Sequence, residues 1–162
     1  MALLSTQIEP PQYLMPAKFL LLMSQILLLT LVLYLRTDHL YTENALGQQT
    51  SASEMSTSQL NKAESTLIGV TVCYIIFMAF EFLMQILGVS LHYNQTNILQ
   101  IFLHILGCTF TLWFILDAWP YASMWPIWVC FGLFPFLLEC GTITQAVVFS
   151  VNVGKNRRGE FK

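Results

Sequence analysis

Residues 67–89 read LIGVTVCYIIFMAFEFLMQILGV, and Glu81 is the one charged side chain in this apolar run. A helix needs about 20 consecutive, mostly apolar residues to cross the hydrocarbon core of a bilayer. The run reaches that length and is therefore predicted to be a transmembrane helix. Its carboxyl group is expensive in hydrocarbon, by a few kcal/mol or more, so it must find a partner inside the protein.

Three further runs, on either side of this one, are long and apolar enough to span a bilayer. The first run is longer than the apolar core of a signal peptide and lacks a small-residue cleavage site behind it, so we expect it to be retained. The fold class is therefore all-α, an integral membrane four-helix up-down bundle. The four predicted transmembrane helices are 16–35, 65–89, 98–116 and 125–150.

The composition agrees with a surface that faces lipid. Apolar residues make up 56% of the 162 residues and charged residues only 10%, against about 25% charged residues in a soluble domain. The net charge of -2 provides no basic field for nucleic acid. The four cysteines lie inside the apolar runs without metal-ligand spacing, and no catalytic constellation is present. We therefore expect no enzyme activity, no cofactor and no metal site.

Lysine and arginine counts predict the orientation, because cytosolic segments carry the excess of these residues. Five of them lie on the side of the two chain ends, counting Lys18, and two lie on the opposite side, Arg36 and Lys62. Both termini are therefore predicted to be cytosolic. The segments outside the spans are then a cytosolic tail (1–15), a lumenal or extracellular Ser/Thr-rich loop (36–64), a short cytosolic loop (90–97), an aromatic outer turn (117–124) and a basic cytosolic tail (151–162).

Two local motifs depend on this arrangement. Asn61 and Glu64 have the spacing of an N-cap and its N3 partner, which predicts that the second helix starts there. Asn94-Gln95-Thr96 matches the acceptor sequence for N-glycosylation. Since its loop is predicted to be short and cytosolic, we expect Asn94 to carry no glycan.

Polar residues inside the predicted spans fall at matching depths. Glu81 and His104 lie at about equal distances from the loop centre near His92 and Tyr93, and Gln85 and Gln100 do so as well. Within each helix the two residues are spaced i,i+4 and therefore share one face. Spans two and three are thus predicted to pack as an antiparallel hairpin, with Glu81 opposite His104 and Gln85 opposite Gln100.

Two more spans are expected to contribute to this layer. Glu139 from the fourth span and Gln25 from the first come to a similar depth. Gly107 lies beyond His104 on the same helical stripe and offers room for close helix approach. The pairing allows protonated His104 beside ionised Glu81, or a neutral pair that shares one proton.

The polar layer has two interpretations. It can fix helix register through interhelical hydrogen bonds worth roughly 1 kcal/mol each. Alternatively, Glu81, His104 and Glu139 can form the path of a small proton- or ion-coupled transporter or channel. A path usually needs polar groups that reach both faces, and the outer half offers only weak ones such as Thr71 and Thr111. The structural interpretation is therefore favoured.

The order and spacing of several short motifs resemble the transmembrane protein 107 family, four-span proteins of the ciliary transition zone. The resemblance covers about residues 16 to 158. It rests on Phe80-Glu81-Phe82, Leu87-Gly88-Val89-Ser90, Asn94-Gln95-Thr96, His104, Asp117-Ala118-Trp119, Trp125, and Pro135 followed by Glu139 and a short basic tail.

The resemblance implies a non-catalytic scaffold in the membrane of the ciliary transition zone. Such a protein helps to assemble the Meckel-syndrome module, which takes part in cilium biogenesis and controls which membrane proteins enter this cell projection. The partners implied are Meckelin, the tectonic proteins, other transition-zone tetraspans and B9-domain proteins. Neither nucleic acid nor a small-molecule substrate is expected.

Overall fold

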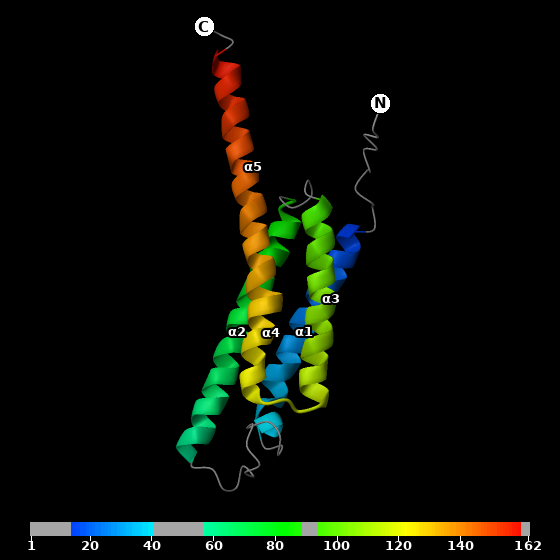
Figure 1. Ribbon diagram of the computed structural model, residues 1–162, viewed down its shortest axis with the longest axis vertical. Helices are drawn as coiled ribbons and strands as arrows, with labels where there is room; N and C mark the ends of the chain where they lie inside the picture. Colours follow the sequence, from blue (N-terminus) through cyan, green and yellow to red (C-terminus); the bar gives the residue numbers. More distant parts are fainter. Residues whose placement is uncertain (1–13, 41–56, 89–93, 160–162) are drawn as a thin grey trace.

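A computed structural model describes residues 14–40, 57–88 and 94–159. Within these ranges the chain is helical apart from short turns, and four of its helical segments are long and apolar enough to span a membrane. The all-α, four-helix prediction is therefore confirmed. The three regular helices are α1 (Leu14–Leu40), α2 (Thr57–Ile86) and α3 (Asn94–Leu116), as Figure 1 shows.

The fourth segment is helical throughout but changes its winding near Pro135. It comprises the 3₁₀ turn η2 (Tyr121–Ser123), α4 (Met124–Trp128), the π-helical turn η3 (Val129–Leu133) and α5 (Phe134–Gly159). Proline has no backbone N–H, and its ring clashes with the carbonyl group one turn earlier in a regular helix. The wider turn at η3 lies directly before Pro135 and accommodates that loss without breaking the span.

The four segments form a square bundle in which α2 and α3 lie on one diagonal. The helix α1 packs on both α2 and α3, and the segment from α4 to α5 packs on the same two helices from the other side. The predicted hairpin of directly packed second and third spans is therefore wrong. Gly107 contributes to this arrangement, because its missing side chain leaves room for the Gln25 side chain of α1 against α3.

All four helical segments extend beyond their predicted transmembrane bounds, and two of them do so together at the end opposite the chain termini. The helix α1 continues to Leu40, and α2 already begins at Thr57, so Asn61 and Glu64 lie inside α2 and the capping prediction is wrong. The Nε atom of Arg36 lies 3.0 Å from Oε1 of Glu64 and links the two helices. These helix ends therefore support each other outside the span. A small buried cluster continues the contact: Leu40 and Ala63, with Leu60 and Tyr121 packed against them.

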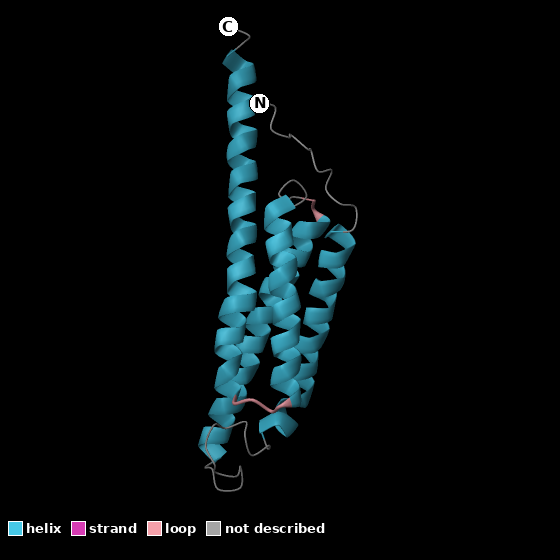
Figure 2. Cartoon of the chain, turned by 45° about the vertical axis from the view of Figure 1, so that its right-hand side comes forward, coloured by secondary structure: helices cyan, strands magenta, loops and turns pink. Residues whose placement is uncertain are grey.

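The two ends of the described chain lie on the same side of the bundle, as the up-down topology requires. Figure 1 shows the start of α1 and the end of α5 at the same end, with α5 projecting beyond the other helices. The turn from α3 to α4 lies at the opposite end, drawn in pink in Figure 2. The predicted tails and loops at 1–13, 41–56, 89–93 and 160–162 lie outside the described residues.

The interior divides into an apolar half and a polar half. Leu29, Val32, Leu67, Phe114 and Met124 belong to one buried apolar cluster, most of which lies in the half nearest the α3–α4 turn. Hydrocarbon does not drive helices together as water does, so this half is held by van der Waals packing. The polar side chains lie in the other half, toward the chain ends.

Candidate functional site

His104 lies at the centre of the polar half and is fully buried. Its Nε2 atom lies 3.1 Å from Oε2 of Glu81, and its Nδ1 atom lies 2.9 Å from Oε1 of Gln25. The Nε2 atom of Gln25 donates a hydrogen bond to the hydroxyl group of Tyr74. The predicted contact of Glu81 with His104 is confirmed, and Gln25 lies at the same level. One imidazole ring thus connects α1, α2 and α3.

This geometry assigns the hydrogens on the imidazole ring. Both ring nitrogens of His104 face oxygen acceptors, so the Nδ1–H donates to the amide oxygen of Gln25. One further hydrogen lies between Nε2 and Oε2 of Glu81. With that hydrogen on nitrogen the pair is an imidazolium with a carboxylate, and on oxygen it is a neutral pair. Both forms keep the same contacts.

A second cluster surrounds the side chain of Lys18, whose partner Gln100 lies one helical turn nearer the chain ends than His104. The Nζ atom of Lys18 donates to Oε1 of Gln100 at 2.6 Å and to Oδ1 of Asn97 at 3.3 Å. It also lies 3.6 Å from Oε2 of Glu139. Since Gln100 Nε2 donates to the same carboxylate oxygen at 2.9 Å, this cluster joins α1, α3 and α5.

Lys18 is one of the site residues that the sequence reasoning missed, together with Tyr74 and Asn97. It was counted as a cytosolic charge, but its side chain is buried and paired. The available signal was its position two helical turns before Gln25, on the same helix face. With Lys18 removed from the count, the basic residues stand at four against two, since 5 − 1 = 4. The predicted orientation is unchanged.

The predicted pairing of Gln85 with Gln100 is wrong. The Nε2 atom of Gln85 donates to the backbone carbonyl of Met15 at 3.0 Å. Gln100 contacts Lys18 and Glu139 instead. Because α2 and α3 are diagonal, α1 lies nearer to Gln85 than α3 does, and charged partners attract the Gln100 amide more strongly than a neutral one.

Glu139, on α5, joins the polar layer through contacts with Gln100 and Lys18. The π-helical turn precedes it, and Gln100 Nε2 lies within 3.3 Å of the Pro135 carbonyl oxygen as well as near the Glu139 carboxylate. The side chain of Gln100 therefore contacts α5 at two points. As predicted, Glu139 approaches from the fourth span, although its partners are Gln100 and Lys18.

Two glycines make room for the polar side chains. A Cβ atom on Gly107 would collide with the Gln25 amide nitrogen, and one on Gly132 would lie 2.8 Å from two ring carbons of Tyr74. The expectation of close approach at Gly107 is confirmed. Gly132 was not singled out in the sequence, because its need for a small residue comes from the ring that α2 places against the π-helical turn.

The charges of the two clusters balance. Lys18 and His104 provide two basic groups, and Glu81 and Glu139 provide two acidic ones, all in side chains with at most 3% exposure. Each carboxyl group uses one oxygen for its contacts, while Oε1 of Glu81 and Oε1 of Glu139 have no partner among the described residues. The layer can therefore hold the helices in register and also retains two carboxyl oxygens that can carry a proton.

The glycosylation prediction is untested by these contacts. Asn94 is the first residue of α3, at the end of the bundle where the chain ends lie.

Within the described residues, no group of three or more histidine, cysteine or acidic side chains could hold a metal ion.

Comparison with known proteins places the chain in a family. A family of transmembrane proteins designated TMEM107 matches residues 14–143. This range includes the first three spans and the fourth span beyond Glu139. Neither the comparison with curated proteins nor the comparison with solved structures gives a match. The chain belongs to the TMEM107 family of transmembrane proteins.

Proposed function

We propose that this chain is a non-catalytic scaffold of the ciliary transition-zone membrane, which helps to assemble the Meckel-syndrome module. Through that module it controls which membrane proteins enter the cilium. The observation that carries the proposal is membership of the TMEM107 family across residues 14–143. The ciliary location and the partners follow from the resemblance described above.

The distribution of polar and apolar side chains supports a scaffold. The charged groups of the spans contact one another inside the bundle, while large apolar side chains such as Leu27, Phe102 and Leu137 are exposed on its outside. A rigid bundle with an apolar exterior offers fixed lateral surfaces to neighbouring membrane proteins. The expected neighbours are Meckelin, the tectonic proteins and other transition-zone tetraspans, with B9-domain proteins at the membrane surface.

The location of the chain in a ciliated cell tests this proposal first. A copy tagged at the C-terminus should concentrate at the ciliary base, between the basal body and the axoneme. Loss of the protein should deplete the partner proteins there while leaving axonemal microtubules in place. A diffuse reticular or plasma-membrane signal, or normal partner localisation in the null mutant, would contradict the proposal.

The unpartnered carboxyl oxygens favour a second candidate, a proton- or ion-coupled transporter. A proton path would use Glu81, His104 and Glu139, but the apolar cluster fills the half of the bundle beyond them. Thr71, at the border, donates its hydroxyl hydrogen to the Leu67 carbonyl of its own helix. The outer half thus provides little for a proton to follow.

The variant Glu81→Gln separates the two candidates. Glutamine keeps an acceptor for the His104 Nε2–H but cannot exchange a proton. A scaffold should retain ciliary localisation and partner recruitment with this variant. A transporter should lose pH-driven flux in sealed vesicles. Glu139→Gln is a poorer choice, because it also removes the counter-charge of Lys18.

A further inference from the structure

Four buried side chains form a row of hydrogen bonds, here called the His104 row, which runs from Tyr74 through Gln25 and His104 to Glu81. Gln25 Nε2 donates to the Tyr74 hydroxyl, and Gln25 Oε1 lies 2.9 Å from His104 Nδ1. On the other side of the ring, Nε2 lies 3.1 Å from Oε2 of Glu81. All four side chains are fully buried, so the hydrogens between them must find their acceptors within the row.

The Tyr74 hydroxyl is only half satisfied in this arrangement. Its oxygen accepts a hydrogen bond from Gln25, but its own hydrogen has no acceptor in the part of the chain that the structure describes. A buried donor without an acceptor is costly, because it has given up its bond to water. The four side chains can therefore make a better row than this one.

Loss of the proton that Glu81 and His104 share would create a conflict in the present row. The ring would keep one hydrogen on Nδ1, and the bare lone pair of Nε2 would face the Glu81 carboxylate. Two acceptors at that distance repel each other. The remaining ring hydrogen therefore moves to Nε2 and donates to Glu81. Nδ1 then becomes an acceptor that faces the Gln25 oxygen, which is an acceptor as well.

A half-turn of the Gln25 amide removes this second conflict. Rotation about the Cγ–Cδ bond exchanges Nε2 and Oε1 at nearly the same two positions. The amide nitrogen then donates to Nδ1 of His104, and the amide oxygen accepts the hydrogen of the Tyr74 hydroxyl. Gly107 leaves room beside the amide, since a Cβ atom there would collide with the Gln25 nitrogen.

We propose that the His104 row is a one-proton switch, in which release of the proton shared by Glu81 and His104 reverses the side-chain amide of Gln25. In the proton-bearing form, hydrogen bonds run from His104 to Gln25 and on to Tyr74. In the proton-free form they run the other way, from Tyr74 to Glu81, and each neighbouring pair has one donor and one acceptor. The released proton goes to water at the membrane surface. The switch is independent of the scaffold role proposed above, and it requires no helix to move.

The other ionisable groups around the row hold their hydrogens in contacts of their own. The charges of Lys18 on α1 and Glu139 on α5 both act on the Glu81 carboxylate, with opposite sign. They lie 3.6 Å from each other and form a pair. On α3, the Cys108 thiol donates to the Leu21 carbonyl. The proton that is left to exchange is therefore the one that Glu81 and His104 share.

Gln100 provides a matched control, because its amide cannot reverse. Its Oε1 atom accepts from the Lys18 ammonium at 2.6 Å, and its Nε2 atom donates to the Glu139 carboxylate at 2.9 Å. A half-turn would set the amide nitrogen against an ammonium and the amide oxygen against a carboxylate. The Gln100 amide should therefore keep its partners while the Gln25 amide exchanges its own.

Solid-state NMR of the full chain in phosphatidylcholine bilayers tests the proposal, with labelled nitrogen in the histidine and glutamine side chains. At about pH 5, Nδ1 of His104 should carry a hydrogen, and at about pH 8 it should be bare while Nε2 keeps its hydrogen. A coupling between Gln25 Nε2 and His104 Nδ1, transmitted through their hydrogen bond, should appear only in the second form. The Gln100 amide should not change its partners over this range.

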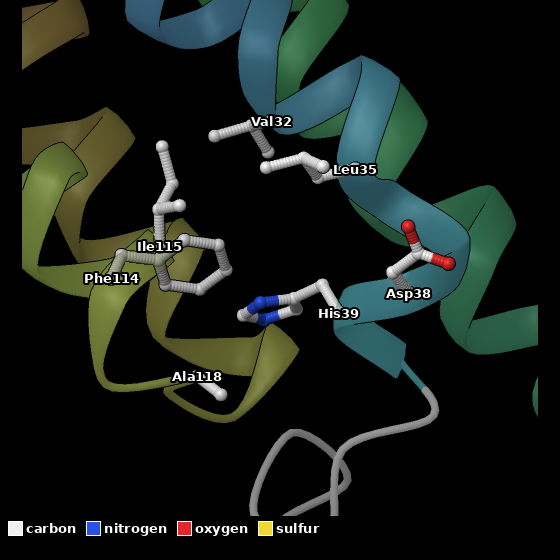
Figure 3. A pocket seen from close by; sticks show the side chains of 7 residues that line it. All are labelled: Val32, Leu35, Asp38, His39, Phe114, Ile115 and Ala118. Carbon is white, nitrogen blue, oxygen red and sulfur yellow. The ribbon is translucent and has the colours of Figure 1, made fainter.

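The two other histidines allow the signals to be assigned without a change in the row. His39→Gln and His92→Gln each remove one ring of the three. His39 is also a reference, because its Nε2 lies 2.9 Å from the Trp119 carbonyl oxygen, which can only accept. Figure 3 shows this ring beside Phe114. Its neutral form must carry the hydrogen on Nε2, and this gives the signal expected of His104 at the higher pH.

Tyr74→Phe should shift the balance between the two forms. In the parent protein only the proton-free form pairs the hydroxyl hydrogen, whereas in the variant both forms leave one group of Gln25 unpaired. At the pH where the parent shows equal amounts of the two forms, the proton-free form should become about tenfold rarer relative to the other. Tyr34→Phe is the control and should change nothing, since Tyr34 is 80% exposed on the outside of α1.

Three results would overturn the proposal. They are a hydrogen that stays on His104 Nδ1 over the whole pH range, a bare Nδ1 that shows no coupling to Gln25 Nε2, and an unchanged balance of forms in Tyr74→Phe. Both tyrosine variants should first show the thermal unfolding of the parent protein. If Tyr74→Phe fails that control, the titration and the coupling in the parent protein decide.

Discussion

Ala118 ends α3 with a backbone φ of 46°, in the left-handed region that favours glycine. The Trp119 amide bonds to the Phe114 carbonyl at 3.2 Å, which closes the helix end in the manner of a Schellman motif. The end of α2 uses Gly88 at the equivalent place, with a φ of 73°. Both helices thus end in a left-handed backbone conformation, but only α2 has a glycine at that position.

Ala118→Gly is therefore expected to stabilise the protein. Relief of the left-handed strain, roughly 1–2 kcal/mol, exceeds the added chain entropy of glycine, roughly 0.5–1 kcal/mol. The free energy of unfolding should rise by about 1 kcal/mol, measured by reversible denaturation in mixed micelles. The same substitution at Ala79, inside α2, is the control and should destabilise. An unchanged or lower stability for Ala118→Gly would contradict the strain argument.

Gly132→Ala tests how tightly the Tyr74 ring is packed against the π-helical turn. The new methyl group would lie 2.8 Å from two carbons of the Tyr74 ring, so the ring must shift and its hydrogen bond with Gln25 is disturbed. Overpacking of this kind costs roughly 1–3 kcal/mol. Gly141→Ala, with nothing within 4 Å of its Cβ, is the matched control and should be neutral or stabilising. Thermal unfolding of the two variants gives the comparison, and equal stability would show that Tyr74 has room to shift.

At the scale of the helices, a pair of charged side chains connects the two helices on each diagonal of the square bundle. Glu81 and His104 connect α2 with α3, and Lys18 and Glu139 connect α1 with α5. Neither pair of helices packs backbone to backbone, so long side chains cover the distance. The two contacts fix the rotation of all four helices at two adjacent levels, which packing of apolar surfaces in lipid does poorly.

The Lys18–Glu139 diagonal predicts strong coupling between the two residues. Lys18→Met alone leaves the buried Glu139 carboxylate without its counter-charge, at a cost on the order of 3 kcal/mol. The double variant Lys18→Met, Glu139→Leu removes both charges and should lose less than the sum of the single losses. Stabilities of the four proteins in a double-mutant cycle measure this. Additive losses would mean that the pair contributes little.

The helices and their polar depths were predictable from the sequence, but the neighbours of each helix were not. Apolar run length gives the spans, and equal distance from a loop gives the level of Glu81 and His104. Which helix lies beside which depends on Gly107 and Gly132, whose partners come from distant segments. For this reason the sequence predicts neither the contact of Gln85 with Met15 nor the burial of Lys18.

On the scale of the whole molecule, the even number of spans places both chain ends on one side of the membrane. Basic residues outside the bundle then predict that this side is cytosolic, even after Lys18 moves into the interior. The opposite face carries the paired ends of α1 and α2, which the contact of Arg36 with Glu64 links.

Protease protection in sealed microsomes checks this orientation. A tag at the C-terminus should be digested, and a tag inserted at 50–56 should be protected, because that loop is predicted to be lumenal. Asn94 should show no glycan, so Asn94→Gln should leave the glycosidase response of the chain unchanged. A protected C-terminal tag, or a glycan lost with Asn94→Gln, would reverse the topology.

The contact between Lys18 and Glu139 also has a consequence for the order of synthesis. The helix α1 leaves the ribosome well before α5, and it carries an ammonium group whose counter-charge lies in α5. At about 5–20 residues per second, the ribosome needs several seconds or more to supply it. Until then Lys18 must reach toward the membrane surface or be shielded by an insertion factor. Chains that stop before α5 therefore retain an unmatched charge, and we expect cells to degrade them rapidly in a pulse-chase experiment.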